Sequence, residues 1–250
     1  MSLFILVVPV RVCGGHMLLK RSIASVVSML LAATCGLACH NAQSLSAAPD
    51  SDAASFSYKF ESPRFHVRVI EIDISPNGAG ELRFVRGESD ELLDLKLKLL
   101  PATIARIRSL FEVSGFLDSK TDYQDKTDMS HLGWTTLTAK QSGRARTVRY
   151  NYTINAQMKE LGDIFRGIAT QEMSLLDIDN AQRYQPLDLP KQLDILENDL
   201  RLEWIAEPER VLTVLTEIAG DDTQPLIARN HAKRIAEAIK KGKYKSPVKK

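Results

Sequence analysis

The stretch "RFHVRVIEIDISPNGAGELRFVR", from Arg64 to Arg86, decides the fold class. Its first half is rich in β-branched residues, and a second strand-like run, "ELRFVR", follows the turn-forming residues of "SPNGAG". Two strands joined by so short a reversal are antiparallel neighbours. The apolar phase changes between Val69 and Ile70, which predicts either a β-bulge or a strand covered on both faces.

The residues that follow extend this hairpin into an α+β fold. "LDLKLKL" alternates apolar and polar residues and predicts a third strand, which makes a meander. Pro101 opens a helix that Gly115 ends. "WTTLTAK" and "RTVRYNY" flank "QSGRA" as a second hairpin, and an amphipathic helix follows between Met158 and Ile168. We therefore expect an α+β fold in which an antiparallel meander and hairpin sheet is packed by helices.

The last third of the chain has helical periodicity throughout and predicts an all-α C-terminal module. One helix lies near residues 190–204, a second is opened by Pro208 and closed by Gly220, and a third ends near Ile239. We expect these helices to dock on the sheet. The two preceding helices alone would leave part of its apolar face exposed to solvent. The expected organisation is a signal peptide at 1–39, a flexible tether at 40–57, an α+β domain at 58–184, the helical module at 185–241 and a basic tail at 242–250.

The N-terminal residues predict export. "MLLKRSIASVVSMLLAATCGLAC" begins at Met17, the expected true start, with a basic pair and then an uncharged apolar run that reaches Ala38. This is the layout of a secretory signal. A membrane span is the rival interpretation, but the run is shorter than the roughly 20 apolar residues that a bilayer requires. Small residues at Gly36 and Ala38 suit cleavage directly before Cys39.

Two resemblances bear on the compartment. "GLAC", residues 36–39, resembles the lipobox of bacterial lipoproteins, although Gly36 stands where leucine is usual. The resemblance implies a lipid anchor on Cys39, and plain secretion is the alternative. The order of elements from Arg64 to Ile168 is similar to exported bacterial domains of unknown function and implies no activity. We expect an exported protein, in the periplasm or anchored to a membrane as a lipoprotein.

Composition narrows the classes of function. All three cysteines lie within the first 39 residues, so a chain that starts at Cys39 has no cysteine pair for a disulfide or a zinc-thiolate site. The formal net charge of +2 argues against a nucleic-acid binder. The sequence has no nucleophile elbow, no His-Glu-x-x-His helix and no phosphate-binding glycine loop. These features predict no cofactor and favour a binding protein over an enzyme.

The stretch "DSKTDYQDKTDMSH", residues 118–131, gathers four aspartates and a histidine, side chains that can bind a metal ion or transfer protons. A calcium loop needs oxygen ligands at alternate positions and a glycine at its sharp turn, and this stretch has neither. We expect no metal here, and a solvated connection is the preferred interpretation over an irregular cation site. Asp122, Asp125 and His131 are kept as candidate binding residues.

A second candidate surface lies on "RARTVRYNY", residues 144–152. Arg146, Arg149 and Tyr150 would bind an anionic glycan by pairing and stacking, or would simply form a solvated outer face. The lysines of the tail allow contact with anionic lipid headgroups or wall polymers. The sequence thus predicts a cell-envelope binding or interaction protein whose partner is an unknown protein or an anionic envelope polymer. The alternative is an envelope hydrolase that uses the Asp-rich loop and the second hairpin.

Overall fold

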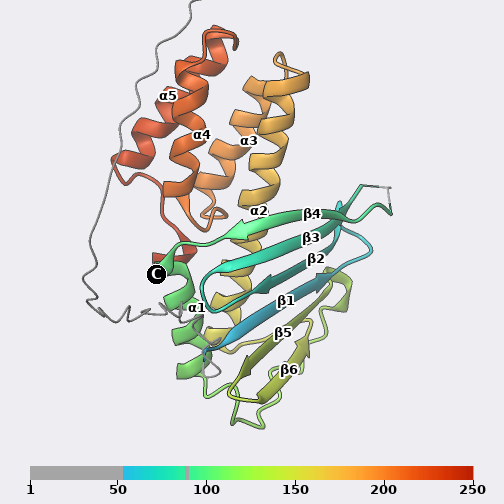
Figure 1. The fold of residues 1–250 in the computed structure, drawn as a ribbon. Coiled ribbons are helices and arrows are strands. Elements are labelled where there is room, and N and C mark those ends of the chain that lie inside the picture. The colour runs from blue at the N-terminus through green and yellow to red at the C-terminus, as the bar shows by residue number, and fades with distance from the viewer. Residues whose placement is uncertain (1–52, 88–89, 250) are drawn as a thin grey trace, which may run out of the picture. The chain divides into compact units, whose positions relative to one another are not determined.

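Six antiparallel strands form one sheet in the computed structural model, which describes residues 53–87 and 90–249 (Figure 1). The order of strands across the sheet is β4-β3-β2-β1-β5-β6. This confirms the predicted α+β class with its meander and its second hairpin. The strands are β1 (Ser55–Glu61), β2 (Val67–Ile74), β3 (Ala79–Arg86), β4 (Leu93–Lys98), β5 (Trp134–Gln141) and β6 (Arg144–Tyr150).

Strand β1 is the element that the sequence analysis missed. It pairs with β2 on one side and with β5 on the other, so it joins the meander to the hairpin (Figure 1). The expected tether boundary at residue 57 is therefore wrong, because the strand begins at Ser55 and Phe56 is already buried. Residues 40–52 of the expected tether and the signal peptide lie outside the described residues.

The predicted irregularity in β2 is a β-bulge. The register between β2 and β3 shifts between Val67 and Val69. Beyond the bulge, Ile70, Ile72 and Ile74 all point into the core. The extra residue thus allows Val67 to pack against the same core as these isoleucines, although it is out of phase with them in the sequence.

Two helices cover one face of the sheet, as Figure 1 shows. The helix α1 (Pro101–Val113) ends where Gly115 takes a φ of +57° and the Phe116 amide donates to the carbonyl of Phe111. This left-handed position is one that glycine adopts without strain. The N-terminal half of α2 (Ala156–Tyr184) packs beside α1, and both contribute to the first hydrophobic core together with all of the strands.

The remaining helices form a second core instead of docking on the sheet. They are α3 (Leu189–Arg201), α4 (Pro208–Gly220) and α5 (Leu226–Lys240), and they bury their apolar stripes against one another and against Ile178 and Ala181 of α2. The expected docking on the sheet is wrong, because α1 and α2 already cover its apolar face. Among the described residues, none from α3, α4 or α5 belongs to the first core. No helix in the described part of the chain is long and apolar enough to cross a membrane.

A buried polar network joins the two cores. Glu207, just before α4, is 1% exposed at its side chain and reaches the start of α1. Its Oε1 accepts hydrogen bonds from the Leu100 amide at 2.7 Å and from the Thr103 hydroxyl, and Arg210 lies 3.2 Å from its Oε2. The Glu207 amide in turn donates to the Gln171 side chain of α2 at 2.7 Å. We call these contacts the Glu207 clamp.

Candidate functional site

The Asp-rich loop uses its carboxylates to fold itself. Asp122, Asp125 and Asp128 each accept a hydrogen bond from the amide two residues later, at 3.0, 2.9 and 2.9 Å. The amide bonds are the main reason why the pKa values of Asp125 and Asp128 lie below their ordinary range. His131 is exposed on a short 3-10 helix. Within residues 53–87 and 90–249, no three His, Cys, Asp or Glu side chains lie where they could hold one metal ion.

Side-chain amides fasten this loop to the residues that follow β6. Gln124 Nε2 donates to Asn151 Oδ1 at 3.1 Å, and the Asn151 amide donates back to Gln124 Oε1 at 2.8 Å. Asn151 also accepts from the Met129 amide and donates to Asp128. These contacts favour the interpretation of the loop as an ordered connection between α1 and β5.

Arg146 and Arg149 do not share a surface, because residues three apart in a strand face opposite sides of the sheet. Arg146 lies on the side of the helices, donates to the carbonyls of Phe116 and Thr121 at 2.6 Å, and stands 5.1 Å from the centre of the Phe116 ring. Arg149 lies on the uncovered face, 4.5 Å from the centre of the Trp134 ring. The arginine pair expected from the sequence is therefore divided between the two faces.

Tyr150 is buried and belongs to the core. Its hydroxyl donates to the carbonyl of Met158 in α2 at 3.0 Å, and burial raises its pKa. A side chain in this position secures the sheet to α2 and offers no stacking surface. Cys39, the candidate for lipidation, lies outside the described residues, so its lipidation stays a prediction.

Ion pairs extend across the face of the sheet that no helix packs against. Arg83 contacts Glu71 at 3.3 Å, Asp73 at 2.6 Å and Glu81 at 3.4 Å. Lys59 extends the pattern to β1 by pairing with Glu71 at 3.2 Å. Charges of both signs alternate across neighbouring strands. This keeps the face hydrated and disfavours its association with another sheet.

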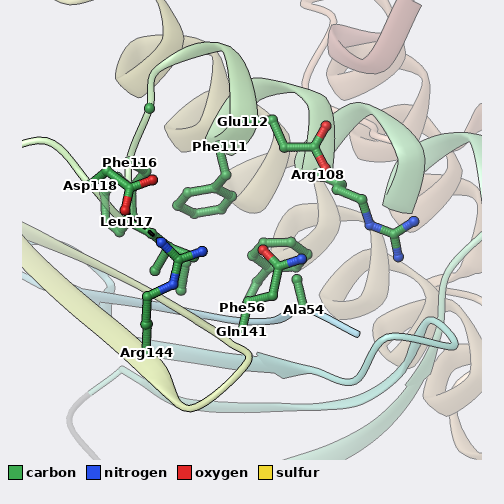
Figure 2. Close-up of a pocket in the computed structure, with 12 residues that line it drawn as sticks. Ala54, Phe56, Arg108, Phe111, Glu112, Phe116, Leu117, Asp118, Gln141 and Arg144 are labelled. Atoms are coloured by element: carbon green, nitrogen blue, oxygen red, sulfur yellow. Dashed lines mark hydrogen bonds and ion pairs between the residues drawn. The ribbon is translucent and has the colours of Figure 1, made fainter. Parts of the chain in front are cut away.

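One hollow lies beside the second hairpin and has a volume of about 320 Å³ (Figure 2). Its floor consists of Phe56 and Phe111, whose rings stack at 4.8 Å between centres. Figure 2 shows Arg144 facing Asp118 on one side, where the two form an ion pair at 2.5 Å, and Arg108 on the other. Both rings of the floor are almost fully buried, so they serve the core and offer little surface to a ligand.

A second hollow, of about 530 Å³, has exposed aromatic walls, and we call it the aromatic hollow. Phe65, Leu202 and Trp204 line it and remain 45%, 46% and 55% exposed. Phe65 comes from the β1–β2 connection, whereas Leu202 and Trp204 come from the α3–α4 connection. Large apolar side chains that stay half exposed around a hollow mark a binding site more often than a core. The remaining lining residues are Asp163, Arg166, Gly167, Thr170, Glu203 and Pro247.

The backbone holds Trp204 in place. The Glu203 residue before it takes a φ of +60°, and the Trp204 amide donates to the carbonyl of Asp199 at 2.9 Å. This is the hydrogen-bond pattern of a helix that ends in a left-handed residue, where glycine is usual. A side chain in that conformation is disfavoured by about 1 kcal/mol, and such strain concentrates where a loop presents a binding residue.

The one positive charge among the described residues that line the aromatic hollow is paired. Arg166 Nη2 contacts Asp163 Oδ1 at 2.7 Å, one turn apart on α2, and Glu203 is the third charged residue of the lining. The lining therefore carries no excess of positive charge. An anionic ligand gains nothing from such a surface, whereas a largely neutral apolar group fits it.

Comparison with known proteins adds no constraint to this geometry. A search matched no family model and no curated protein. The aromatic hollow was not predicted, because the sequence pattern places Phe65 in a strand and Trp204 in a helix. Both residues lie just outside those elements. Phe65 continues the spacing of Val67 and Val69, and Trp204 continues that of Leu196 and Leu200, so no signal in the sequence separated them from the core.

Proposed function

We propose that the chain is an exported binding protein of the bacterial cell envelope and that its partner occupies the aromatic hollow. The exposure of Phe65, Leu202 and Trp204 around one hollow is the observation that carries the binding role. Aromatic and large aliphatic side chains of this kind act as anchors in protein interfaces. The secretory pattern before Cys39 supports the export part of the proposal.

Of the two partner classes predicted from the sequence, a protein fits the aromatic hollow better than an anionic polymer. The lining pairs Arg166 with Asp163 and adds Glu203, so no free positive charge would attract a polyanion. Interfaces between proteins are built from an apolar centre with a polar rim, which is the arrangement here. The partner is therefore a protein segment that presents an apolar side chain to Trp204.

The alternative role as a hydrolase lacks support from the Asp-rich loop. Asp122 and Asp125 bond to amides of their own loop, and neither lines any hollow described above together with His131. A general acid or base must lie within hydrogen-bond reach of a substrate that some cavity holds in place. The carboxylates of this loop are instead occupied in folding it.

Site-specific photo-crosslinking in the native cell tests the proposal. A benzophenone amino acid at Leu202 should give a discrete adduct with one protein in the envelope fraction, and Trp204→Ala should remove that adduct. The same substitution at Leu132, which is 47% exposed and lies outside the aromatic hollow, is the matched control. The proposal fails if position 202 gives no adduct, if both positions give the same adducts, or if the chain stays in the cytosol.

A further inference from the structure

One carboxylate organises a group of cationic side chains near the C-terminal ends of α3 and α5. Glu197 Oε1 accepts from Arg201 Nη2 at 2.7 Å and from the Tyr244 hydroxyl at 3.2 Å. Its Oε2 accepts from Arg234 Nη2 at 3.3 Å and lies 2.8 Å from His231 Nε2. Glu197 itself is nearly buried beneath these groups. Burial alone would raise its pKa, but the surrounding hydrogen bonds prevail and lower it to about 2.

A hollow of about 340 Å³ opens over this group, and we call it the basic hollow. Four of its lining residues are cationic and two are carboxylates, one of which is the nearly buried Glu197. Positive charge thus exceeds negative charge around the basic hollow, in contrast to the paired charges of the aromatic hollow. The lining residues are Glu197, Arg201, Arg234, Glu237, Ala238, Lys241, Lys243 and Tyr244.

A structural role accounts for only part of this arrangement. Cationic residues near the end of a helix offset its dipole, which explains why Arg201 and Lys241 are favourable where they are. The helix dipole does not explain why the guanidinium groups of Arg201 and Arg234 both contact the carboxylate of Glu197. Glu197 engages only Nη2 of Arg201 and of Arg234, and these side chains remain 63% and 66% exposed. Each guanidinium has five N–H donors, so both retain donors for a ligand.

We propose that the basic hollow binds a phosphate group. Guanidinium groups match phosphate oxygens in a forked geometry, and lysine adds charge without directional demand. Because Glu197 already fixes Arg201 and Arg234, little side-chain freedom is lost on binding. Lys241 and Lys243 supply the charge that a doubly charged phosphate requires. The phosphate group belongs either to a soluble compound or to the headgroup of an anionic phospholipid, and the site shares no residue with the aromatic hollow.

Two titrations of the full chain distinguish these sources. Calorimetry with inorganic pyrophosphate measures binding of a soluble phosphate, and sedimentation with phosphatidylglycerol vesicles measures binding to headgroups, with phosphatidylcholine vesicles as the neutral reference. Binding of pyrophosphate alone assigns the soluble source. Binding to phosphatidylglycerol vesicles that pyrophosphate displaces assigns the headgroup. If neither probe binds above the neutral reference at low salt, the proposal is wrong.

Variants locate the binding in the basic hollow. Arg201→Gln and Arg234→Gln should each weaken binding about tenfold, the usual effect of losing one charged hydrogen bond. Arg183→Gln removes an exposed arginine of α2 that pairs with Asp179 and should change binding less than about twofold. If the arginine variants melt below the parent, the exposed pair Lys241→Gln and Lys243→Gln provides the same test. Equal losses in Arg183→Gln and in the variants of the basic hollow would overturn the assignment.

Discussion

Replacing Glu207 by alanine should weaken the connection between the two cores and lower the free energy of unfolding more than a substitution of an exposed residue does. The side chain extends from the start of α4 to the start of α1, where it accepts from the Leu100 amide and the Thr103 hydroxyl. Arg210 lies 3.2 Å from its other oxygen. With the carboxylate removed, three polar groups lose a partner at once, in a region where Glu207 is 1% exposed.

The expected loss of stability follows from these contacts. A buried donor left without a partner costs about 1–3 kcal/mol, and breaking a buried charge pair costs about 3–5 kcal/mol in total. Because Arg210 is only partly buried and also contacts Glu172 at 2.6 Å, its charge remains paired in the variant. We therefore expect Glu207→Ala to lower the free energy of unfolding by about 4 kcal/mol, mainly through the Leu100 amide and the Thr103 hydroxyl.

Urea denaturation followed by circular dichroism measures this loss. Glu217→Ala, an exposed substitution on the same helix, is the matched control and should stay within about 0.5 kcal/mol of the parent. Thr103→Val removes only one of the bonds and should lose about 1 kcal/mol, less when Glu207 is already alanine. A loss below about 1 kcal/mol in Glu207→Ala would refute the reasoning that the clamp joins the cores.

Three further predictions concern Glu197, Tyr150 and Gly80. The pKa of Glu197 lies at about 2, below its ordinary value, so its contribution to stability is complete above about pH 4.5 and is lost as the pH falls towards 2. The stability gap between the parent and Glu197→Gln, measured in urea, should narrow by about 2 kcal/mol from pH 6 to pH 3, and an unchanged gap would contradict this. Tyr150→Phe removes a buried hydrogen bond to α2 and should cost about 1 kcal/mol in thermal unfolding, whereas no change would mean that the bond is negligible. Gly80→Ala would place a methyl group against the carbonyl of Asp73 and should cost about 2 kcal/mol or more, while Gly220→Ala, with open space around it, should be neutral.

The fold could be predicted from the sequence wherever a local pattern determines the element. The bulge of β2, the proline that opens α1 and the limits of α4 all follow from residues that act on their immediate neighbours. Strand β1 was missed because small polar residues precede it, although Phe56, Tyr58 and Phe60 alternate inward along it. The docking of the last helices depends on which apolar face is already covered, and a sequence pattern carries no such information.

The candidate sites were less predictable, because they depend on which residues meet in space. Arg146 and Arg149 are close in sequence, yet the pleat of the strand divides them between two faces. Phe65 and Trp204 are far apart in sequence, yet they line one hollow. The contact between Glu197 and Arg234 likewise requires knowledge of how α3 packs on α5, whereas Arg201 lies four residues after Glu197 on the same helix.

The segment from Leu202 to Glu207 links the proposed binding role to the architecture. Its backbone is hydrogen-bonded at both ends, since the Trp204 amide donates to the carbonyl of Asp199 and the Glu207 amide donates to the Gln171 side chain. Ordering a flexible loop on binding costs about 1–2 kcal/mol of conformational entropy per residue. This segment is already ordered in the folded chain, so a partner does not have to order it. A partner that contacts Trp204 therefore meets a fixed surface, which favours binding. Phe65 stacks on Phe60 of the first core, and Trp204 directly precedes Ile205 of the second core. A partner that spans both residues must therefore also stabilise the junction that the clamp holds.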